Sequence, residues 1–155
     1  GRNAFANYGI KFNLNEKGEP EVVQRDWVGK KFAGTNKPWL YTSGLKGLTK
    51  IKVPLLEKGQ KGKYTVNLGF AKLPEDIEGS RIFDIKIQGE TVHESLDIAK
   101  VAGDFEKVVI HKFNGVDVLE NLEIELVPKN IDDAKLASTV IQTLEITRED
   151  FRASN

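Results

Sequence analysis

The sequence predicts an all-β fold, a jelly-roll-like antiparallel β-sandwich with little helix. Apolar and polar residues alternate with a period of two in several short segments, and β-branched and aromatic residues occupy the apolar positions. Turn segments rich in glycine or proline separate these segments, and helical periodicity is almost absent. About eight to ten short strands in a chain of this length are typical of two facing sheets.

The composition is that of an ordinary globular domain and excludes several classes of partner. The chain has 155 residues, and its 23 Lys and Arg residues balance its 23 Asp and Glu residues. Nucleic acids and anionic membranes attract basic surfaces, so we expect neither as a partner. Cysteine is absent, which excludes disulfides, thiolate metal sites and a cysteine nucleophile. Methionine is also absent, even at position 1, so we expect a processed chain or a piece of a longer one.

The first third of the chain is the least regular. Residues 9–14 predict a strand, and a turn through Gly18 and Pro20 follows it. Residues 21–32 mix apolar and charged side chains, and residues 39–47 form a short aromatic segment that ends in two glycines. Residues 48–56 alternate again and predict a strand, with Pro54 near its end, where a missing backbone donor matters least.

The centre of the chain carries the clearest pattern. In residues 64–71 and 81–88, apolar side chains occupy every second position. We expect these two strands to form a hairpin. The connection between them, LPEDIEGS, is polar and has little that could be buried. Loops held between rigid strands are where β-sandwiches usually carry binding groups.

The last third continues the pattern of strands and turns. Residues 91–98 are expected to be extended, and residues 97–105 to hold one helical turn that ends at Gly103. A tight turn is expected at Gly115, and a long polar loop over residues 128–138. Further strands are expected at residues 107–113, 116–118, 122–127 and 139–147. We expect one domain over residues 1–148 and a tail or linker over residues 149–155.

Motifs for catalysis are missing. His93 and His111 show no HxH, HxxxH or HExxH spacing, so we expect both to be surface or strand residues. No serine lies in a GxSxG elbow, and no GxxxxGK[ST] loop is present. The carboxylate pairs Glu75/Asp76 and Asp132/Asp133 lie in polar loops, where such pairs are usually solvated. The sequence therefore predicts that the protein is not an enzyme.

Three aromatic residues at or beside loops are candidates for ligand binding, namely Trp27, Trp39 and Tyr41. An exposed ring can pack on the C–H face of a sugar, while a nearby carboxylate or amide takes the hydroxyl groups. The alternative is that these rings hold irregular loops onto the sandwich.

The segment from residue 64 to 103 resembles the malectin and malectin-like domains. The family signature is a strand ending in F-A-E, a variable loop, then R-x-F-D-V, a glycine, D-I and a V-G turn. The matching positions here are Phe70-Ala71-Lys72, Arg81-Ile82-Phe83-Asp84-Ile85, Gly89, Asp97-Ile98 and Val101-Ala102-Gly103. Upstream, Leu40-Tyr41-Thr42 is similar to the family's L-Y-Q-T segment, and the strands at residues 122–126 and 143–146 match its last strands. The resemblance covers residues 8–148, and its style is that of bacterial members within larger exported proteins.

The resemblance implies a β-sandwich that binds a glycan or polysaccharide without cleaving it, in an extracellular or periplasmic location. It places Tyr41, Trp27 and either Asp132 or Asp133 at the family's sugar-binding positions. With two further loop residues added, we expect Trp27, Tyr41 and Trp39 to stack on a sugar, and Asp132, Asp133 and Glu75 to accept its hydroxyl hydrogen bonds. Other domains of a parent protein are possible partners. One departure matters, because Lys72-Leu73-Pro74-Glu75 stands where the animal lectin carries two consecutive aromatic residues. The alternative is therefore a structural or protein-interaction domain that has lost the sugar site.

No cofactor is expected. Jelly-roll sugar binders often hold a structural calcium ion through loop carboxylates and carbonyl oxygens. The acidic segments Glu75–Glu78 and Asp132–Asp133 could supply such ligands, but the sequence has no spaced calcium-ligand motif.

Overall fold

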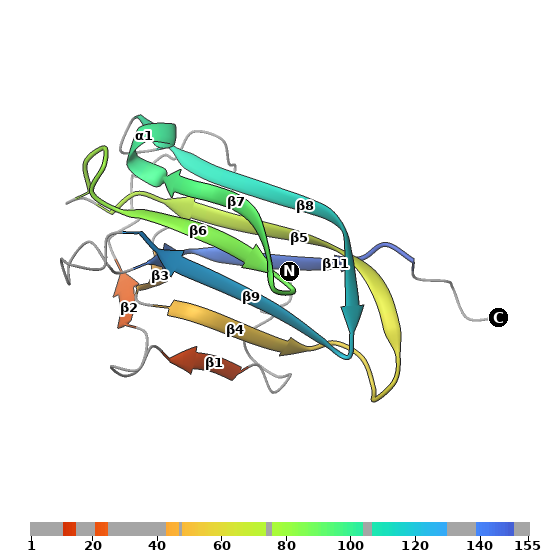
Figure 1. Ribbon diagram of the computed structural model, residues 1–155. Helices are drawn as coiled ribbons and strands as arrows, with labels where there is room; N and C mark the ends of the chain where they lie inside the picture. Colours follow the sequence, from red (N-terminus) through yellow and green to blue (C-terminus); the bar gives the residue numbers. More distant parts are fainter. Residues whose placement is uncertain are drawn as a thin grey trace.

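The protein is a two-layered antiparallel β-sandwich with one short helix in its described part (Figure 1). The computed structural model describes residues 11–14, 21–24, 43–46, 48–73, 76–103, 107–129 and 139–150. Two expectations are therefore confirmed, the all-β class and the small helical content.

One layer is built from five strands, which lie in the order β1-β4-β9-β6-β7. They span Lys11–Leu14 (β1), Leu48–Pro54 (β4), Asn121–Pro128 (β9), Ile82–Ile87 (β6) and Glu90–Asp97 (β7). The second layer has the order β8-β5-β11. Its strands span Val108–Leu119 (β8), Lys61–Ala71 (β5) and Thr143–Arg148 (β11). Within the described residues, strand pairing passes from one layer to the other where β8 turns into β9, through the pair Leu119 and Asn121.

A small sheet and a short helix complete the described part of the chain. The sheet has the order β10-β3-β2. Its strands span Val140–Ile141 (β10), Ser43–Lys46 (β3) and Glu21–Gln24 (β2). The helix α1, Ile98–Ala102, ends at Gly103, which has a φ of 63° and donates its N–H to the Ala99 carbonyl. The expected helical turn ending at Gly103 is confirmed.

The apolar positions read from the alternation fill the space between the layers. In β5 they are Tyr64, Val66, Leu68 and Phe70, and in β6 they are Phe83, Ile85 and Ile87. The matching positions of β9 are also buried. This burial removes most of the apolar surface of these strands from water, which is the main favourable term in folding.

The expected hairpin between β5 and β6 is wrong. Strand β5 pairs with β8 and β11, whereas β6 pairs with β7 and β9, so the connection between β5 and β6 crosses from one layer to the other. The rings of Phe70 and Phe83 meet across the core, with their centroids 5.6 Å apart. Both apolar faces are therefore buried against each other, which edge-to-edge pairing in one sheet would not achieve.

The expected tight turn at Gly115 is also wrong. Residues 108–119 form the single strand β8, and Gly115 lies at a bulge within it, where the pairing with β5 shifts register. Its φ of 67° lies in the left-handed region that glycine adopts most readily, and its N–H donates to the Glu149 carboxylate at 2.7 Å. The reversal of the chain occurs at Glu120, between β8 and β9.

Candidate functional site

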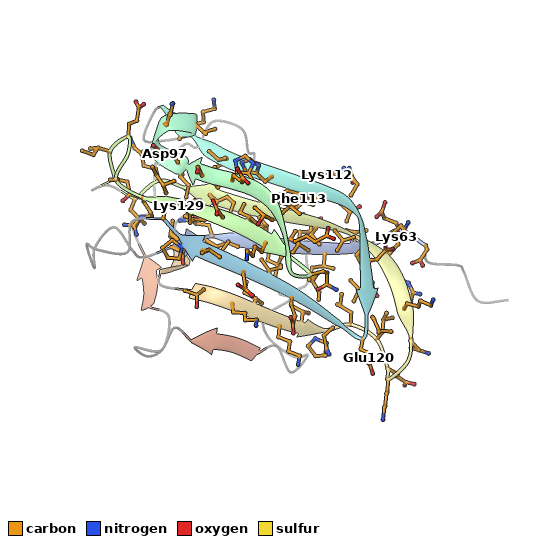
Figure 2. The ribbon with its side chains drawn as sticks, in the orientation of Figure 1. Lys63, Asp97, Lys112, Phe113, Glu120 and Lys129 are labelled. Atoms are coloured by element: carbon orange, nitrogen blue, oxygen red, sulfur yellow. The ribbon has the colours of Figure 1, made fainter. Side chains whose placement is uncertain are left out.

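Several connections between strands lie together at one end of the sandwich, where they could bind a ligand. Three register pairs fix this end, Ala71 with Val108, Ile82 with Asp97, and Phe83 with Pro128. The connections after β5, β7 and β9 therefore all begin there, and the small sheet and α1 lie there too (Figure 1). We call it the α1 end. Figure 2 shows Asp97 and Lys129 at this end, and Lys63 and Glu120 at the opposite end.

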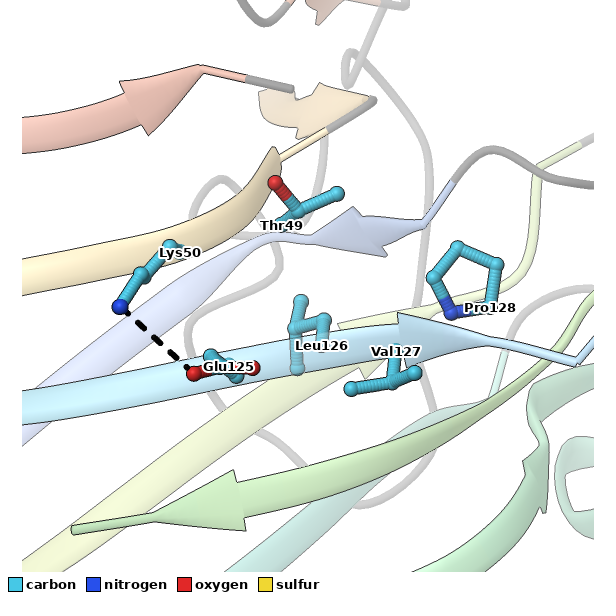
Figure 3. Close-up of a pocket in the computed structure, with 6 residues that line it drawn as sticks. All are labelled: Thr49, Lys50, Glu125, Leu126, Val127 and Pro128. Atoms are coloured by element: carbon cyan, nitrogen blue, oxygen red, sulfur yellow. Dashed lines mark ion pairs between the residues drawn. The ribbon is translucent and has the colours of Figure 1, made fainter. Parts of the chain in front are cut away.

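An open pocket of about 280 Å³ lies at the α1 end, between β4 and β9. The pairing of these strands stops at Lys50 and Glu125, and beyond that pair they part. Figure 3 shows the lining residues, which are Thr49, Lys50, Glu125, Leu126, Val127 and Pro128. The volume is close to the lower limit of about 300 Å³ for small-molecule sites.

The pocket combines charged, hydroxyl and apolar groups. The Lys50 ammonium lies 3.7 Å from the Glu125 carboxylate, and both side chains are partly exposed. Thr49 adds a hydroxyl group, and Val127 and Pro128 add apolar surface. Groups of these kinds can hydrogen-bond sugar hydroxyls and cover a C–H face.

The segment between β5 and β6 is held by a buried ion pair. The Arg81 guanidinium contacts both carboxylate oxygens of Asp76 at 3.0–3.2 Å, and Asp76 also accepts the Leu73 N–H. All three side chains are buried. The expectation that this connection has little to bury is therefore wrong. So is the expected solvation of the Glu75/Asp76 pair as it applies to Asp76, because Arg81 occupies an inward-facing position and needs a counter-ion there.

Asp97 joins three elements at the α1 end. One carboxylate oxygen accepts the Gly79 N–H at 2.7 Å, and the other caps α1 by accepting the Lys100 N–H at 3.2 Å. The side chain is buried. Asp97 therefore ties the 76–81 turn to the junction of β7 and α1.

We expect Asp97→Ala to lower the free energy of unfolding by about 1–2 kcal/mol, because the helix loses its cap. Chemical denaturation measures the loss, and amide hydrogen exchange should show reduced protection at Gly79. Asp117→Ala is the matched control, since that carboxylate is 85% exposed. Equal destabilisation by the two changes would contradict the assigned role of Asp97.

Asp84, the aspartate of the R-x-F-D motif, also has a structural role. It accepts the Ser95 N–H at 2.8 Å and lies 3.0 Å from the Lys129 ammonium. The Ser95 hydrogen bond is the main factor that lowers the pKa of this carboxyl, and Lys129 adds to it. The motif residues Arg81, Asp84 and Asp97 thus hold the connections at the α1 end in place.

The structure brings the two histidines together, which the sequence analysis missed. Their ring centroids lie 4.4 Å apart, and both side chains are half-buried. Each lies on a strand, as expected, but on facing strands of the two layers. The inward register of His111, between Val109 and Phe113, is the signal that could have indicated contact with the opposite layer.

All six residues predicted to bind a ligand lie outside the described residues, namely Trp27, Trp39, Tyr41, Glu75, Asp132 and Asp133. Their places along the chain are nevertheless informative. Tyr41 shortly precedes β3, and Asp132 shortly follows Pro128, the last residue of β9. The predicted calcium ligands likewise lie outside the described residues, except for the segment 76–78.

Metal-binding clusters and membrane-spanning helices are both absent from the described residues. No three His, Asp or Glu side chains there gather as a metal ion would require. Within the same residues, none of the helical structure is long and apolar enough to span a membrane.

A family model described as the malectin domain matches residues 1–149. No curated protein sequence matches the chain at a significant level.

Solved structures share the fold. The ANX2 ectodomain from Arabidopsis thaliana has a TM-score of 0.69 and 12% sequence identity, with 89% of this chain and 42% of that chain covered. Bacteroides uniformis beta-glucuronidase 2 has a TM-score of 0.65 and 18% identity, with 83% and 13% covered. A chain from the complex of the plant peptide RALF23 with FER and LLG2 has a TM-score of 0.62 and 15% identity, with 83% and 38% covered. The present chain therefore spans less than half of each of these proteins.

Proposed function

Because the chain belongs to the malectin domain family, we propose that it is a non-catalytic carbohydrate-binding module of a larger exported bacterial protein. Its proposed ligand is a glycan or polysaccharide, and its proposed location is extracellular or periplasmic. The ANX2 neighbour is an ectodomain, which supports the location. The Bacteroides neighbour, of which this chain spans 13%, supports a place within a multidomain protein of bacteria.

The observation that carries the proposal is the pocket between β4 and β9. It opens at the end of the sandwich where the chain leaves β9 toward Asp132 and Asp133. It is also lined from the start of β4, which is separated from β3 by residue 47 alone. Tyr41, Asp132 and Asp133 are therefore close along the chain to the strand ends that form the pocket.

In the proposed site, aromatic rings and carboxylate oxygen atoms contact different parts of the sugar. Trp27, Trp39 and Tyr41 would pack on the C–H faces of a sugar, and Asp132, Asp133 and Glu75 would accept its hydroxyl groups. Lys50 and Glu125 would contact hydroxyls at the pocket mouth. Binding of this kind requires no proton transfer, so we expect no hydrolysis of aryl glycosides by the isolated chain.

We expect a glycan array to identify a ligand and Tyr41→Ala to weaken its binding by about tenfold or more, which corresponds to about 1.4 kcal/mol. Isothermal titration with the identified glycan measures the change. Leu119→Ala is the control, because Leu119 is an exposed apolar residue at the opposite end of the sandwich. A flat array from a well-folded chain, or equal binding by Tyr41→Ala and the unmodified chain, would contradict the proposal.

A second candidate is a protein-interaction domain without a sugar site. The sequence Leu73-Pro74-Glu75, in place of two aromatic residues, favours it. So does the likeness to a chain from the complex of the peptide RALF23 with FER and LLG2. A flat glycan array together with selection of a peptide ligand from a display library would favour this function over the first.

A further inference from the structure

The contact between His93 and His111 closes the open edge of the sandwich. In the described part of the chain, β7 pairs only with β6, and β8 pairs with β5 along its length and with β9 only at its last residue, Leu119. These two strands are therefore the facing edges of the two layers. Their histidine rings meet with centroids 4.4 Å apart and planes inclined at 60°.

The surroundings of the pair are apolar. Phe70 meets the His111 ring edge-on and Phe113 stacks on it, each with a centroid distance of 6.3 Å. Leu68 lies opposite His111 in the register of β5 and β8, and Ile85 lies opposite His93 in that of β6 and β7. Both of these aliphatic residues are fully buried. The site therefore suits two neutral imidazoles better than a charged one.

No group among the described residues compensates a proton on His111. Its Nε2 atom is buried and has no hydrogen-bond partner in this part of the chain. The strands packed around it present Leu68, Phe70 and Ile85, none of which titrates.

The charged side chains near His111 on the described strands do not face its imidazole. Glu94 on β7 and Lys112 on β8 are exposed, and alternation places them on the outer faces. Asp84 on β6 is engaged by the Ser95 N–H and by Lys129. His93 remains as the charge that acts on His111.

We propose that the His93–His111 contact is an acid-sensitive latch between β7 and β8. Neutral imidazoles hold the two edge strands together, and protonation opens this edge while the rest of the core stays closed. When both rings are protonated, two like charges face each other in a poorly solvated site, and separating the strands relieves both the repulsion and the lost hydration. This latch does not depend on the proposed glycan site.

The direction of the pH dependence follows from the burial. Burial lowers the pKa of the His111 imidazole below its ordinary value, and His93 lowers it further. An imidazole released to water keeps a pKa of about 6.5, so the opened edge takes up protons first as the pH falls. The closed edge is therefore fully stable at neutral pH and loses stability as the pH falls through about 6.5. The loss levels off once the pH lies below the pKa of His111 in the closed form.

Amide hydrogen exchange, corrected for intrinsic rates, tests the latch. EDTA is present so that trace metal ions do not bind the two imidazoles. Between pH about 7.5 and pH about 5.5, we expect β7 and β8 to lose protection by up to about tenfold, while β4 and β9 keep theirs. The double variant His93→Phe/His111→Phe keeps the ring packing without titration, so its β7 and β8 should stay protected at both pH values. Unchanged protection of these strands in the unmodified chain, or an equal loss in the double variant, would overturn the proposal.

Two further measurements keep the test decisive. The control variant Glu94→Gln/Lys112→Gln removes the exposed charges next to the histidines, and we expect it to retain the pH dependence of the unmodified chain. If the phenylalanine variant does not fold, NMR titration of the two imidazoles in the unmodified chain decides the question. We expect the pKa of His111 to lie below its ordinary value, and titration of His111 near pH about 6.5 would overturn the latch.

Discussion

Replacing Asp76 with alanine is expected to lower the free energy of unfolding by about 3–5 kcal/mol, because it leaves the Arg81 guanidinium without its buried counter-ion. Both side chains are under 5% exposed, and two guanidinium nitrogens contact the carboxylate. Asp76 also accepts the Leu73 N–H, so its loss frees the connection between β5 and β6. Urea denaturation measures the change, and amide exchange over residues 76–81 reports the loosening.

Two companion variants separate the buried charge from other effects. Glu78→Gln changes a carboxylate in the same connection that is 68% exposed and 4.0 Å from the Lys100 ammonium, and we expect a change within about 0.5 kcal/mol. The double variant Asp76→Ala/Arg81→Met removes both charges and should be less destabilised than Asp76→Ala alone. If the double variant were the less stable of the two, the buried charge of Arg81 would not be the cause of the destabilisation of Asp76→Ala.

The strands of this fold could be predicted from the sequence, but their partners could not. Alternation assigns Phe83 and Ile85 to a buried face and Lys86 to an outer one, and the structure agrees. The same pattern is compatible with any neighbouring strand, and proximity along the chain favoured pairing of β5 with β6. The actual pairing is decided by burial of both apolar faces, which stacks the strands in opposite layers.

The sequence does contain a signal for the structural roles at the α1 end, namely a polar residue at an inward-facing position of a strand. Arg81 continues the inward register of Phe83, Ile85 and Ile87, so its charge had to meet a carboxylate, and Asp76 is the acid it meets. His111 likewise follows Val109 in an inward register. A polar residue at an inward position therefore predicts a partner, although alternation alone does not identify that partner when it lies on another strand.

Phe83→Ala is expected to cost about 3–5 kcal/mol of the free energy of unfolding, through lost burial and the cavity that remains. Phe83 is fully buried, and its ring lies against Phe70 of the opposite layer. The matched control is Ile82→Ala, one residue earlier on the outer face of β6, where we expect a loss of roughly 1 kcal/mol. Equal losses in urea denaturation would mean that β6 is shifted by one residue, since such a shift exchanges its two faces.

A double-mutant cycle between Phe70→Leu and Phe83→Leu tests the crossing of the layers directly. The ring centroids are 5.6 Å apart and the planes are inclined at 55°, a tilted geometry that favours contact between ring edge and ring face. We expect a coupling energy of about 0.5–1.5 kcal/mol between the two positions.

In a β5–β6 hairpin, the two rings would lie in one sheet, and the strand register would decide whether they touch. The cycle Phe70→Leu with Ile87→Val gives the comparison, because Ile87 lies on the same buried face of β6 but further from its start. Coupling confined to Phe83 supports the stacked arrangement, and equal coupling at both positions would contradict it.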